Sequence, residues 1–478
     1  MKLRRLRDHF FIYGFLCLVW YLLRTGTKPS RAVYPCQQSA GFVAHLWTLT
    51  YAAPVLAAVE SDRFRIHWKT VVLVLLIGVG AYGYMNLNNT DDYEMSPVNL
   101  NLEPATATEP DPSVIYAITG TNGADDGVNR LIDLMDEHDQ PFYLSSNEDE
   151  TQGPTGFIGK NDVVLIKVNS QWDERGGTNS DLVKSIVEAI INHPDGWRGE
   201  IVIADNGQAQ YGGAGRGGSL DWMKNNAQNQ SQSIQDVADM YAEYRVSAYL
   251  WDTITSNVVQ EFAEGDSEDG YVVQTSVIPS TGTIVSYPKF TTVYDTQISF
   301  KYGVYKPEIE DYDIDRLKVI NVPVLKTHMI YGVTGAVKHY MGVPSDKLSA
   351  GLGYRIHGAV GQGAMGTLMA QTRVPTLNIV DAIYVNALPK DGPSTPYMSA
   401  TQTNIIAAST DPVAIDYWAS KQILCKICEE NRDNTSTLDP DNTDEGEFGD
   451  WLRLSMNELN AAGHDFTVDP VKITVYVK

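Results

Sequence analysis

Strand-length apolar runs without polar alternation recur along the second part of the chain, and segments with a helical period separate them. Runs of this kind are typical of strands that are buried on both faces. Their alternation with helices indicates a parallel sheet that is covered on both sides. We therefore predict an α/β fold for residues 114–478, with a mostly parallel sheet and helices on both of its faces. The strands are expected at 114–118, 163–168, 201–204, 319–325, 377–385, 405–408 and 473–477, and the helices at 128–135, 182–191, 234–244, from Pro412 onward and at 451–459.

Two segments depart from this pattern. In residues 265–311, Tyr, Val, Thr, Ile and Ser alternate at shorter spacing, which predicts a β-rich, antiparallel insertion. Residues 90–113 are polar, contain proline and have no period, so we expect a linker between the α/β domain and whatever precedes it.

Three apolar stretches lie within residues 1–89, at 10–23, 40–59 and 71–87. A bilayer core needs roughly 20 apolar residues and tolerates about 17, so the third stretch is the best candidate for a span. The first stretch follows several basic residues, but no small-residue cleavage site comes after it, so an anchor is expected rather than a signal peptide. These features predict a membrane region with two or three transmembrane helices, and hence the lipid bilayer as a partner.

The charge of the chain is sharply divided. Residues 1–89 hold ten Lys/Arg and three Asp/Glu, which leaves 26 of the 36 basic and 56 of the 59 acidic residues for the remainder. An acidic surface of this size argues against nucleic acid and against anionic lipid as partners. The basic N-terminus favours the cytoplasmic side, so three spans place the acidic domain outside the cytoplasm and two spans place it inside. We expect the extracytoplasmic arrangement in the cell membrane.

Polar residues follow or end four of the predicted strands. They are Lys167 with Asn169, Asp205 with Asn206, Lys326 with Thr327 and His328, and Asp381. The carboxyl ends of parallel strands lie along one edge of a sheet, so these groups are expected to converge there. Each of them alone could also be a helix cap or a turn former.

The segment 321–342 holds the strongest candidates. Lys326 and Lys338 suit an anionic ligand or, when desolvated, nucleophilic chemistry. Together with Lys167 and His328 they form the candidate catalytic set. Gly332 and Gly335 let the backbone approach a ligand, and a helix that begins near Thr334 would attract an anion, although Thr334 could simply cap that helix. The remaining candidate ligand-binding residues are Asn169, Thr327, Asp381 and Arg355.

Histidines in the same region suggest a second chemistry. His328 and His357 could hold a divalent metal or act as general bases near neutral pH. Farther along, Asp411 and Asp416 lie near the predicted site, although Asp411 is also placed to cap the helix that Pro412 opens. Cys425 and Cys428 lie on the buried face of a predicted helix, and they could be free thiols, a redox pair or half of a metal site.

Four passages resemble one family, the prokaryotic domain of unknown function numbered 362. The most specific is Asn321-Val322-Pro323-Val324-Leu325-Lys326-Thr327-His328, which continues through Gly332 to Gly342; the others lie at 164–169, 378–382 and 407–416. The resemblance covers about 160–420. It implies no assigned activity, and this chain lacks the cysteines of the ferredoxin-type modules that some members carry. His339 stands where the family often has asparagine.

These observations lead to two hypotheses of different kinds. In the first, the protein is a membrane-anchored enzyme that acts on a small anionic substrate at the sheet edge, with a metal held by His328 and His357 as a variant. In the second, it is a ligand-binding or cell-surface assembly protein without catalysis, in which the lysines hold the ligand.

Overall fold

The computed structural model of this chain describes residues 97–110, 112–148, 151–208, 217–349 and 355–478. The chain divides into two compact units, Met1–Glu94 and Met95–Lys478, and all described residues belong to the second. The predicted transmembrane stretches therefore lie outside the described residues. Within the ranges above, no helix is long and apolar enough to cross a bilayer.

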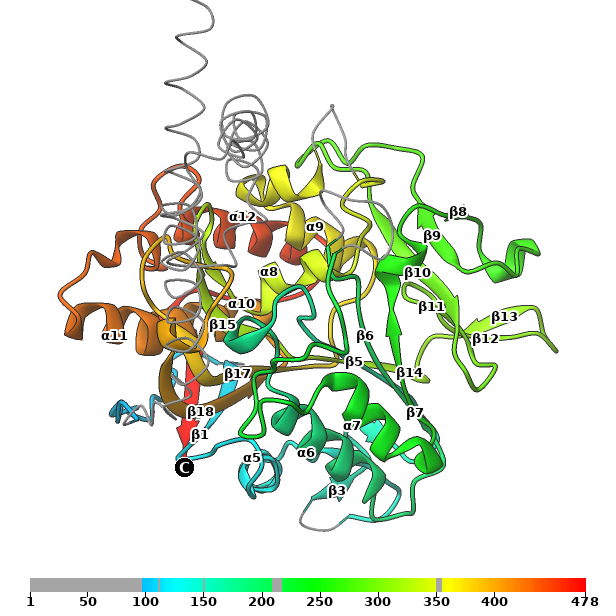
Figure 1. Ribbon diagram of the computed structural model, residues 1–478, viewed down its shortest axis with the longest axis horizontal. Coiled ribbons are helices and arrows are strands. Elements are labelled where there is room, and N and C mark those ends of the chain that lie inside the picture. The colour runs from blue at the N-terminus through cyan, green and yellow to red at the C-terminus, as the bar shows by residue number, and fades with distance from the viewer. Residues whose placement is uncertain (1–96, 111, 149–150, 209–216, 350–354) are drawn as a thin grey trace, which may run out of the picture. The chain divides into compact units, whose positions relative to one another are not determined.

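A ten-stranded sheet forms the centre of the second unit (Figure 1). Along the main path the strand order is β19-β1-β18-β17-β14-β5-β6-β7, and β15 and β16 extend it beside β17. Its strands are β1 (Ser113–Thr119), β5 (Val163–Lys167), β6 (Glu200–Asp205), β7 (Val246–Leu250), β14 (Leu317–Asn321), β15 (Val324–His328), β16 (Gly332–Thr334), β17 (Leu377–Asn386), β18 (Thr401–Ser409) and β19 (Ile473–Val477).

The sheet is mixed, and the prediction of a mostly parallel sheet is wrong in this respect. Strands β17, β14, β5, β6 and β7 are parallel neighbours, but β18 runs antiparallel to both β17 and β1, and β16 runs antiparallel to β15. The reason lies in the connections. Residues 387–400 return β18 directly alongside β17, with one short 3-10 turn (Tyr397–Ser399) in place of the crossover helix that joins parallel strands.

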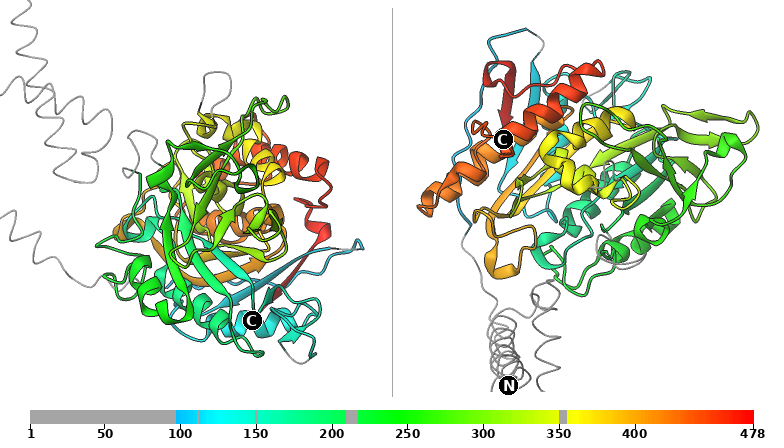
Figure 2. Two further views of the ribbon diagram at one scale, coloured as in Figure 1. Left: turned by 90° about the vertical axis from the view of Figure 1, so that its right-hand side faces the viewer. Right: turned by 90° about the horizontal axis from the view of Figure 1, so that it is seen from above.

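Helices cover both faces of the sheet (Figures 1 and 2). One face carries α5 (Gly127–Asp136), α6 (Ser180–Ile191) and α7 (Ile234–Met240), whose apolar side chains pack on residues such as Ile118, Val164 and Ile203. The other face carries α8 (Ala336–His339), α9 (Ala364–Gln371), α10 (Pro412–Ala419), α11 (Cys425–Glu430) and α12 (Phe448–Ala461). The two apolar clusters are separate because alternate residues of each buried strand face opposite sides.

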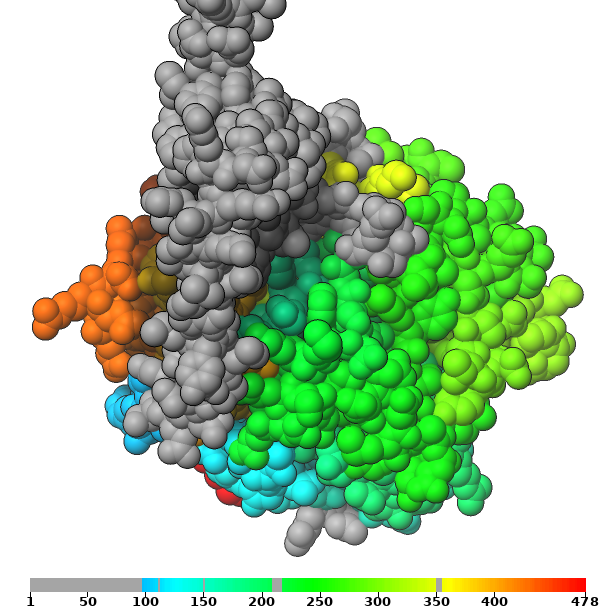
Figure 3. Space-filling model, viewed as in Figure 1, coloured from blue at the N-terminus to red at the C-terminus, as the bar shows by residue number. Residues whose placement is uncertain are grey.

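A second sheet, of six strands, lies at one side of this unit, where its light-green strands project in the space-filling view (Figure 3). All of its neighbouring strands are antiparallel except β8 and β9. It includes most of the predicted insertion, 265–311, and extends beyond it at both ends. Its strands, in spatial order, are β13 (Asp311–Asp313), β12 (Gly303–Lys306), β11 (Gln297–Ser299), β10 (Ser286–Thr291), β9 (Gly270–Val273) and β8 (Val258–Val259).

A third, small sheet was not predicted. Its strands β2 (Tyr143–Leu144), β3 (Gln152–Gly153) and β4 (Ile158–Gly159) have two residues each, too few to show a period in the sequence.

The predicted strand 319–325 is divided into β14 and β15 by Val322 and Pro323. Proline has no N–H to donate to a ladder, so pairing stops there. The long strand β17 bridges the break: its first residues pair with β14 and its later residues with β15, where Val324 lies opposite Asp381 and Lys326 opposite Asn386. As a consequence, Lys326 and His328 lie within a strand and Asp381 lies in the middle of one, rather than after strand ends as predicted.

Candidate functional site

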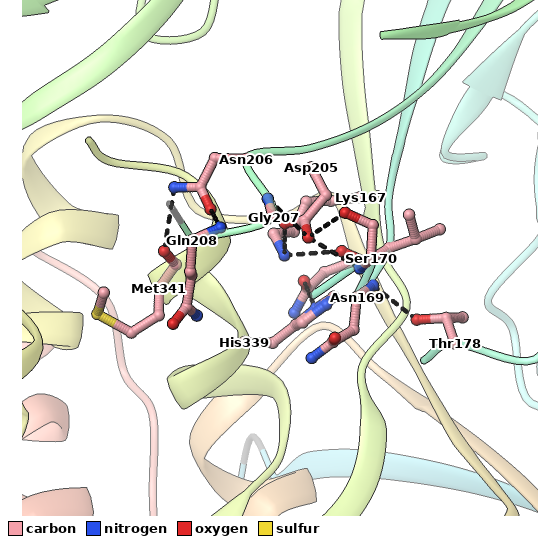
Figure 4. A network of polar contacts seen from close by, with 12 residues as sticks. Lys167, Asn169, Ser170, Thr178, Asp205, Asn206, Gly207, Gln208, His339 and Met341 are labelled. Atoms are coloured by element: carbon pink, nitrogen blue, oxygen red, sulfur yellow. Dashed lines mark hydrogen bonds and ion pairs between the residues drawn. The ribbon is translucent and has the colours of Figure 1, made fainter. Parts of the chain in front are cut away.

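Lys167 and Asp205 form a buried ion pair at the carboxyl ends of β5 and β6 (Figure 4). The Lys167 Nζ lies 2.9 Å from Asp205 Oδ1 and donates a second hydrogen bond of 2.9 Å to the carbonyl of Val168. Asp205 Oδ2 accepts from the backbone N–H and the hydroxyl of Ser170, each at 2.9 Å. Both partners are therefore satisfied within the protein. Burial lowers the pKa of Lys167, and Asp205 opposes that shift.

Gly342 packs directly against this ion pair. A Cβ at this position would lie 2.0 Å from Asp205 Oδ1 and 2.3 Å from Lys167 Nζ, so no other residue fits without displacing the pair. The neighbouring Asn206 holds the same turn, because its N–H donates to the Gly342 carbonyl at 3.1 Å and its amide donates to the carbonyl of Pro344. The requirement for glycine here comes from close packing against charged side chains.

Lys326 reaches from β15 to the backbone of the loop before α6, where its Nζ donates to the carbonyl of Gly176. The side chain is completely buried. Burial lowers the pKa of Lys326 well below its usual value, and the charges of Lys338 and Lys167 act in the same direction. On the adjacent strand, Thr334 lies directly opposite Lys326, and its hydroxyl has no hydrogen-bond partner among the described residues.

Lys338 differs from the other two lysines. It lies in α8 and is 4% exposed, yet its Nζ makes no hydrogen bond and no ion pair with any residue in the described ranges. The ammonium group lies 5.6 Å from the centre of the Tyr331 ring. Burial lowers the pKa of Lys338 to about 7, and the carboxylate of Asp346 opposes this only in part. The amine is thus available both as a charge and as a base.

His328, Tyr331 and His357 lie together beside Lys338. The His328 ring centre lies 5.4 Å from that of Tyr331 and 5.6 Å from that of His357. Burial lowers the pKa of His328 well below its ordinary value, and burial also lowers that of His357 to about 3; the charge of Lys338 adds to both shifts. Both imidazoles are therefore neutral at physiological pH.

The hydrogen bonds of His328 determine which chemistry it can support. Its Nδ1 accepts the N–H groups of Ile330 at 3.1 Å and Tyr331 at 3.3 Å. In the neutral ring the hydrogen must then be on Nε2, which makes that atom a donor rather than a metal ligand. Among the described residues, no group of three or more His, Cys, Asp or Glu side chains is placed to hold a metal ion. The donor set thus fits an anionic ligand better than a divalent metal.

An internal carboxylate occupies the start of helix α8, where the sequence suggested an anionic ligand. Asp416 Oδ1 accepts the N–H of Ala336 at 2.5 Å, and its Oδ2 accepts that of Val337 at 2.9 Å. Gly335 makes room for it, because a Cβ there would lie 2.2 Å from Asp416 Oδ1. Thr334 does not cap the helix; the N-cap is Gly335, which has no side chain to do so.

Two further predicted ligand-binding residues have internal structural roles. Gly332, the first residue of β16, has φ +72°, and a Cβ would lie 1.9 Å from the Thr437 carbonyl oxygen. Thr327 is completely buried on the opposite side of β15 from Lys326, and its hydroxyl donates to the Gly332 carbonyl at 3.3 Å. Neither residue is placed to meet a ligand.

Asp381 is also engaged within the protein. Its Oδ2 accepts from the N–H of Asn179 at 2.8 Å and from the amide of Asn226 at 3.2 Å, and its Oδ1 accepts from the N–H of Ile383 at 3.2 Å. Burial raises the pKa of Asp381 to about 7, against the effect of the hydrogen bond from Asn179. This carboxyl fixes the start of α6 to the middle of β17.

Asn169, Arg355 and Asp411 complete the predicted set. The backbone of Asn169 donates to the hydroxyl of Thr178 at 2.8 Å, whereas its side-chain Oδ1 is buried without a partner among the described residues. Arg355 is exposed and lies 3.8 Å from Asp346. Asp411 caps α10, since its Oδ1 accepts the N–H groups of Val413 and Ala414 at 2.8 and 2.9 Å, in agreement with the capping alternative.

Three residues of this region were not singled out from the sequence. Asp346 and Tyr331 flank Lys338, and Asn321 holds the ring of His339 through a 2.7 Å contact between its Oδ1 and Nδ1. A polar residue at the end of the apolar strand β14 was the available signal for Asn321. Asp346 lies in a loop, and no local pattern distinguishes it.

The cysteine pair lies away from this cluster, on the helical segment that contains α11. Cys425 and Cys428 are both free and buried, as the buried-thiol alternative predicts. Burial raises the pKa of Cys425 to about 12 and also raises that of Cys428, so neither is a reactive thiolate.

Comparison with known proteins supports the family resemblance over part of the chain. The family described as Domain of unknown function (DUF362) matches residues 295–421, which include Lys326, His328, Lys338 and Asp416. Neither the curated proteins nor the solved structures gave a match.

Proposed function

We propose that the protein binds a small anionic ligand at the carboxyl edge of its large sheet, and that Lys338 is the cation which this ligand meets. The observation that carries the proposal is the isolation of the Lys338 amine: it is 4% exposed and makes no hydrogen bond or ion pair with any described residue. A buried charge without a partner is costly, and proteins keep such groups chiefly where they serve a function. An anion would supply the missing partner.

The surroundings of Lys338 favour an anion over a neutral ligand. Lys326 is a second buried amine near this site, since the charge of Lys338 lowers its pKa. The hydroxyl of Thr334 and the Nε2–H of His328 add hydrogen-bond donors on the same side of the hairpin formed by β15 and β16. A carboxylate or a similar oxyanion accepts from all of these groups.

The proposal concerns binding and includes no reaction. An amine with a pKa of about 7 is suited to proton transfer or nucleophilic attack at neutral pH. However, no carboxylate or imidazole in the described ranges forms a hydrogen bond with Lys338 that would relay a proton. Binding is therefore the function that the geometry supports best, and catalysis by Lys338 would be a further property of the same site.

We also propose that the stretches 10–23, 40–59 and 71–87 anchor the chain in the cell membrane, with the α/β unit on the extracytoplasmic side. The support is the length and apolar character of these stretches and the division of charge between a basic N-terminal region and an acidic remainder.

Anion binding can be measured by thermal unfolding of the full chain with and without malonate or inorganic phosphate. A ligand at one hundred times its Kd stabilises the folded state by about 2.7 kcal/mol, so the midpoint of unfolding should rise. Lys338→Met should abolish the rise, because it removes the charge while keeping a side chain of similar length. Lys347→Met, which changes an exposed lysine nine residues away, should leave the rise intact. An equal rise in the Lys338→Met variant would refute the proposal.

A further inference from the structure

Four large apolar side chains are exposed along one rim of the large sheet, which we call the apolar rim: Met329, Ile330, Leu388 and Met398. Their exposed fractions are 45%, 62%, 46% and 86%. Met329 and Ile330 form the tip of the hairpin between β15 and β16, and the other two lie in the connection between β17 and β18. Clustered exposure of large apolar side chains commonly marks a surface that meets a partner or a membrane.

Strand pairing brings Met329 and Ile330 close to the segment that contains Leu388. Lys326 of β15 pairs in parallel with Asn386 of β17, so the hairpin tip and the segment that contains Leu388 leave the sheet side by side. The N–H of Met329 also donates to the carbonyl of Gly392 at 3.1 Å, which joins the hairpin tip to the connection that carries Leu388 and Met398.

The first described residues of the unit join the large sheet near this rim. The N–H of Val98 donates to the carbonyl of Gln402 at 2.8 Å, and Gln402 lies at the start of β18, opposite Tyr384 near the end of β17. Three residues after Val98, the carbonyl of Asn101 accepts a 3.1 Å hydrogen bond from the Nζ of Lys426. The first described residues are therefore fixed to the large sheet at Gln402, which follows Met398 by four residues.

The connection to the apolar stretches is short. Ten steps of the chain separate Leu87, the last residue of the third stretch, from Pro97. A fully extended chain covers at most about 3.6 Å per residue, so this tether reaches roughly 35 Å. A folded unit of this size is about 55 Å across. The reach is shorter than the unit is wide, so a bilayer that contained residues 71–87 would favour contact with the side on which the described chain begins.

We propose that the apolar rim rests in the interfacial layer of the same bilayer that holds the N-terminal stretches. This inference rests on the proposed membrane anchor and adds the orientation of the α/β unit on the lipid surface. The four side chains would bury their apolar surface at the boundary between headgroups and acyl chains, as interfacial segments do. Exposed apolar residues of the second sheet suit this role less well; Ile309, for example, lies between Glu308 and Glu310.

Methionine oxidation tests the orientation with residues that the chain already contains. The full chain is reconstituted in phosphatidylcholine vesicles, floated to show that it is bound, and exposed to hydroxyl radicals generated from hydrogen peroxide, which reaches both sides of the bilayer. Met240, at the end of α7 and outside the apolar rim, is the internal control, with 49% exposure against 45% for Met329 and 86% for Met398. In water, Met398 should oxidise faster than Met240. In the vesicles we expect Met398 and Met329 to oxidise several-fold more slowly than Met240.

Paired substitutions provide the second readout. Ile330→Asp combined with Leu388→Asp should restore fast oxidation of Met398 in protein that still floats with the vesicles, because charged side chains do not enter the interface. Val293→Asp, at an exposed apolar position of the second sheet, should change nothing. Floating protein in which Met398 oxidises faster than Met240 would overturn the orientation alone. Protein that does not float would overturn the membrane anchor and the orientation together.

Discussion

At the scale of single residues, the three buried lysines differ in the partner of their amine. Lys167 has a carboxylate partner, Lys326 has a carbonyl partner, and Lys338 has neither among the described residues. The cost of removing each charge should differ accordingly. An ion pair that loses one member leaves the other charged and buried, whereas the loss of an unpaired charge relieves a penalty.

We expect Lys338→Met to stabilise the ligand-free protein by about 2 kcal/mol and Lys167→Met to destabilise it by about 3–5 kcal/mol, because Asp205 would remain buried without its partner. Chemical denaturation at pH 7 measures both changes. A destabilised Lys338→Met variant would show that the amine has an internal structural role instead.

The gain from Lys338→Met should depend on pH with a definite sign. The folded-state pKa of Lys338 is about 7, below the value of an unfolded lysine near 10.4, so the wild-type protein loses stability as pH falls from about 10 to 7. The uncharged methionine has no such dependence. The difference in unfolding free energy between variant and wild type should therefore be largest at pH 7 and below, and should shrink as the pH approaches 10. A constant difference from pH 7 to 10 would contradict the assigned shift.

At the scale of elements, the start of α8 depends on a residue 80 positions from its first residue. The helix has four residues and would leave its first N–H groups without partners if Asp416 did not accept from Ala336 and Val337. Burial raises the pKa of Asp416 to about 7, against the effect of these hydrogen bonds. Lys338 belongs to this helix, so its position depends on the same cap.

Gly335→Ala and Asp416→Ala should each destabilise the protein by about 2–3 kcal/mol, since the first displaces the carboxylate and the second removes it. The double variant should cost little more than either single change, because both disrupt one interaction. A double-mutant cycle by chemical denaturation measures the coupling. Additive losses would mean that the two positions act independently.

The sequence predicts elements whose pattern is local, and it misses those that depend on contacts between distant segments. The periods at 128–135 and 182–191 correspond to α5 and α6, and the apolar runs correspond to strands of the large sheet. The apolar run 319–325 continues through Pro323, so it hides the break between β14 and β15. Asp381 resembles a strand end because a charged residue is rare inside a buried strand; its stabilisation by Asn179 and Asn226 cannot be read from neighbouring residues.

The same limit applies to the candidate site. Lys167, Lys326, His328 and Lys338 were predicted to lie together at one edge of the sheet. In the structure Lys338 lies in α8 and Lys326 lies within β15; the charges of Lys338 and Lys167 lower the pKa of Lys326, and those of Lys338 and Lys326 lower the pKa of His328. Gly332 and Gly335 were interpreted as parts of a ligand site because a glycine-containing turn before a helix is typical of anion binding, and Asp416 was expected only to lie nearby. Only the fold shows that the anion in this turn belongs to the protein.

At the scale of the whole unit, Cys425 and Cys428 provide a probe of unfolding. Both lie among helices on one face of the large sheet, far in sequence from the candidate site, and burial suppresses their reactivity. In a Cys17→Ser/Cys36→Ser background, both thiols should resist alkylation in the native protein and react together at the denaturant concentration where fluorescence shows unfolding. Earlier reaction would show that the α11 region opens before the rest of the unit.

The occupation of the α8 start by Asp416 has a consequence for selectivity. Sites that hold phosphate at a helix N-terminus use several backbone N–H groups at fixed positions. Such a set of donors distinguishes a tetrahedral oxyanion from a planar one. Here those groups are already used, and the donors that remain are side chains: the Lys338 amine, the Thr334 hydroxyl and the Nε2–H of His328. An amine on a flexible side chain attracts an anion through its charge, but it places little restriction on the shape of that anion. Discrimination among anions would then come from contacts with the remainder of the ligand, so that planar and tetrahedral anions of equal charge compete on nearly equal terms at Lys338.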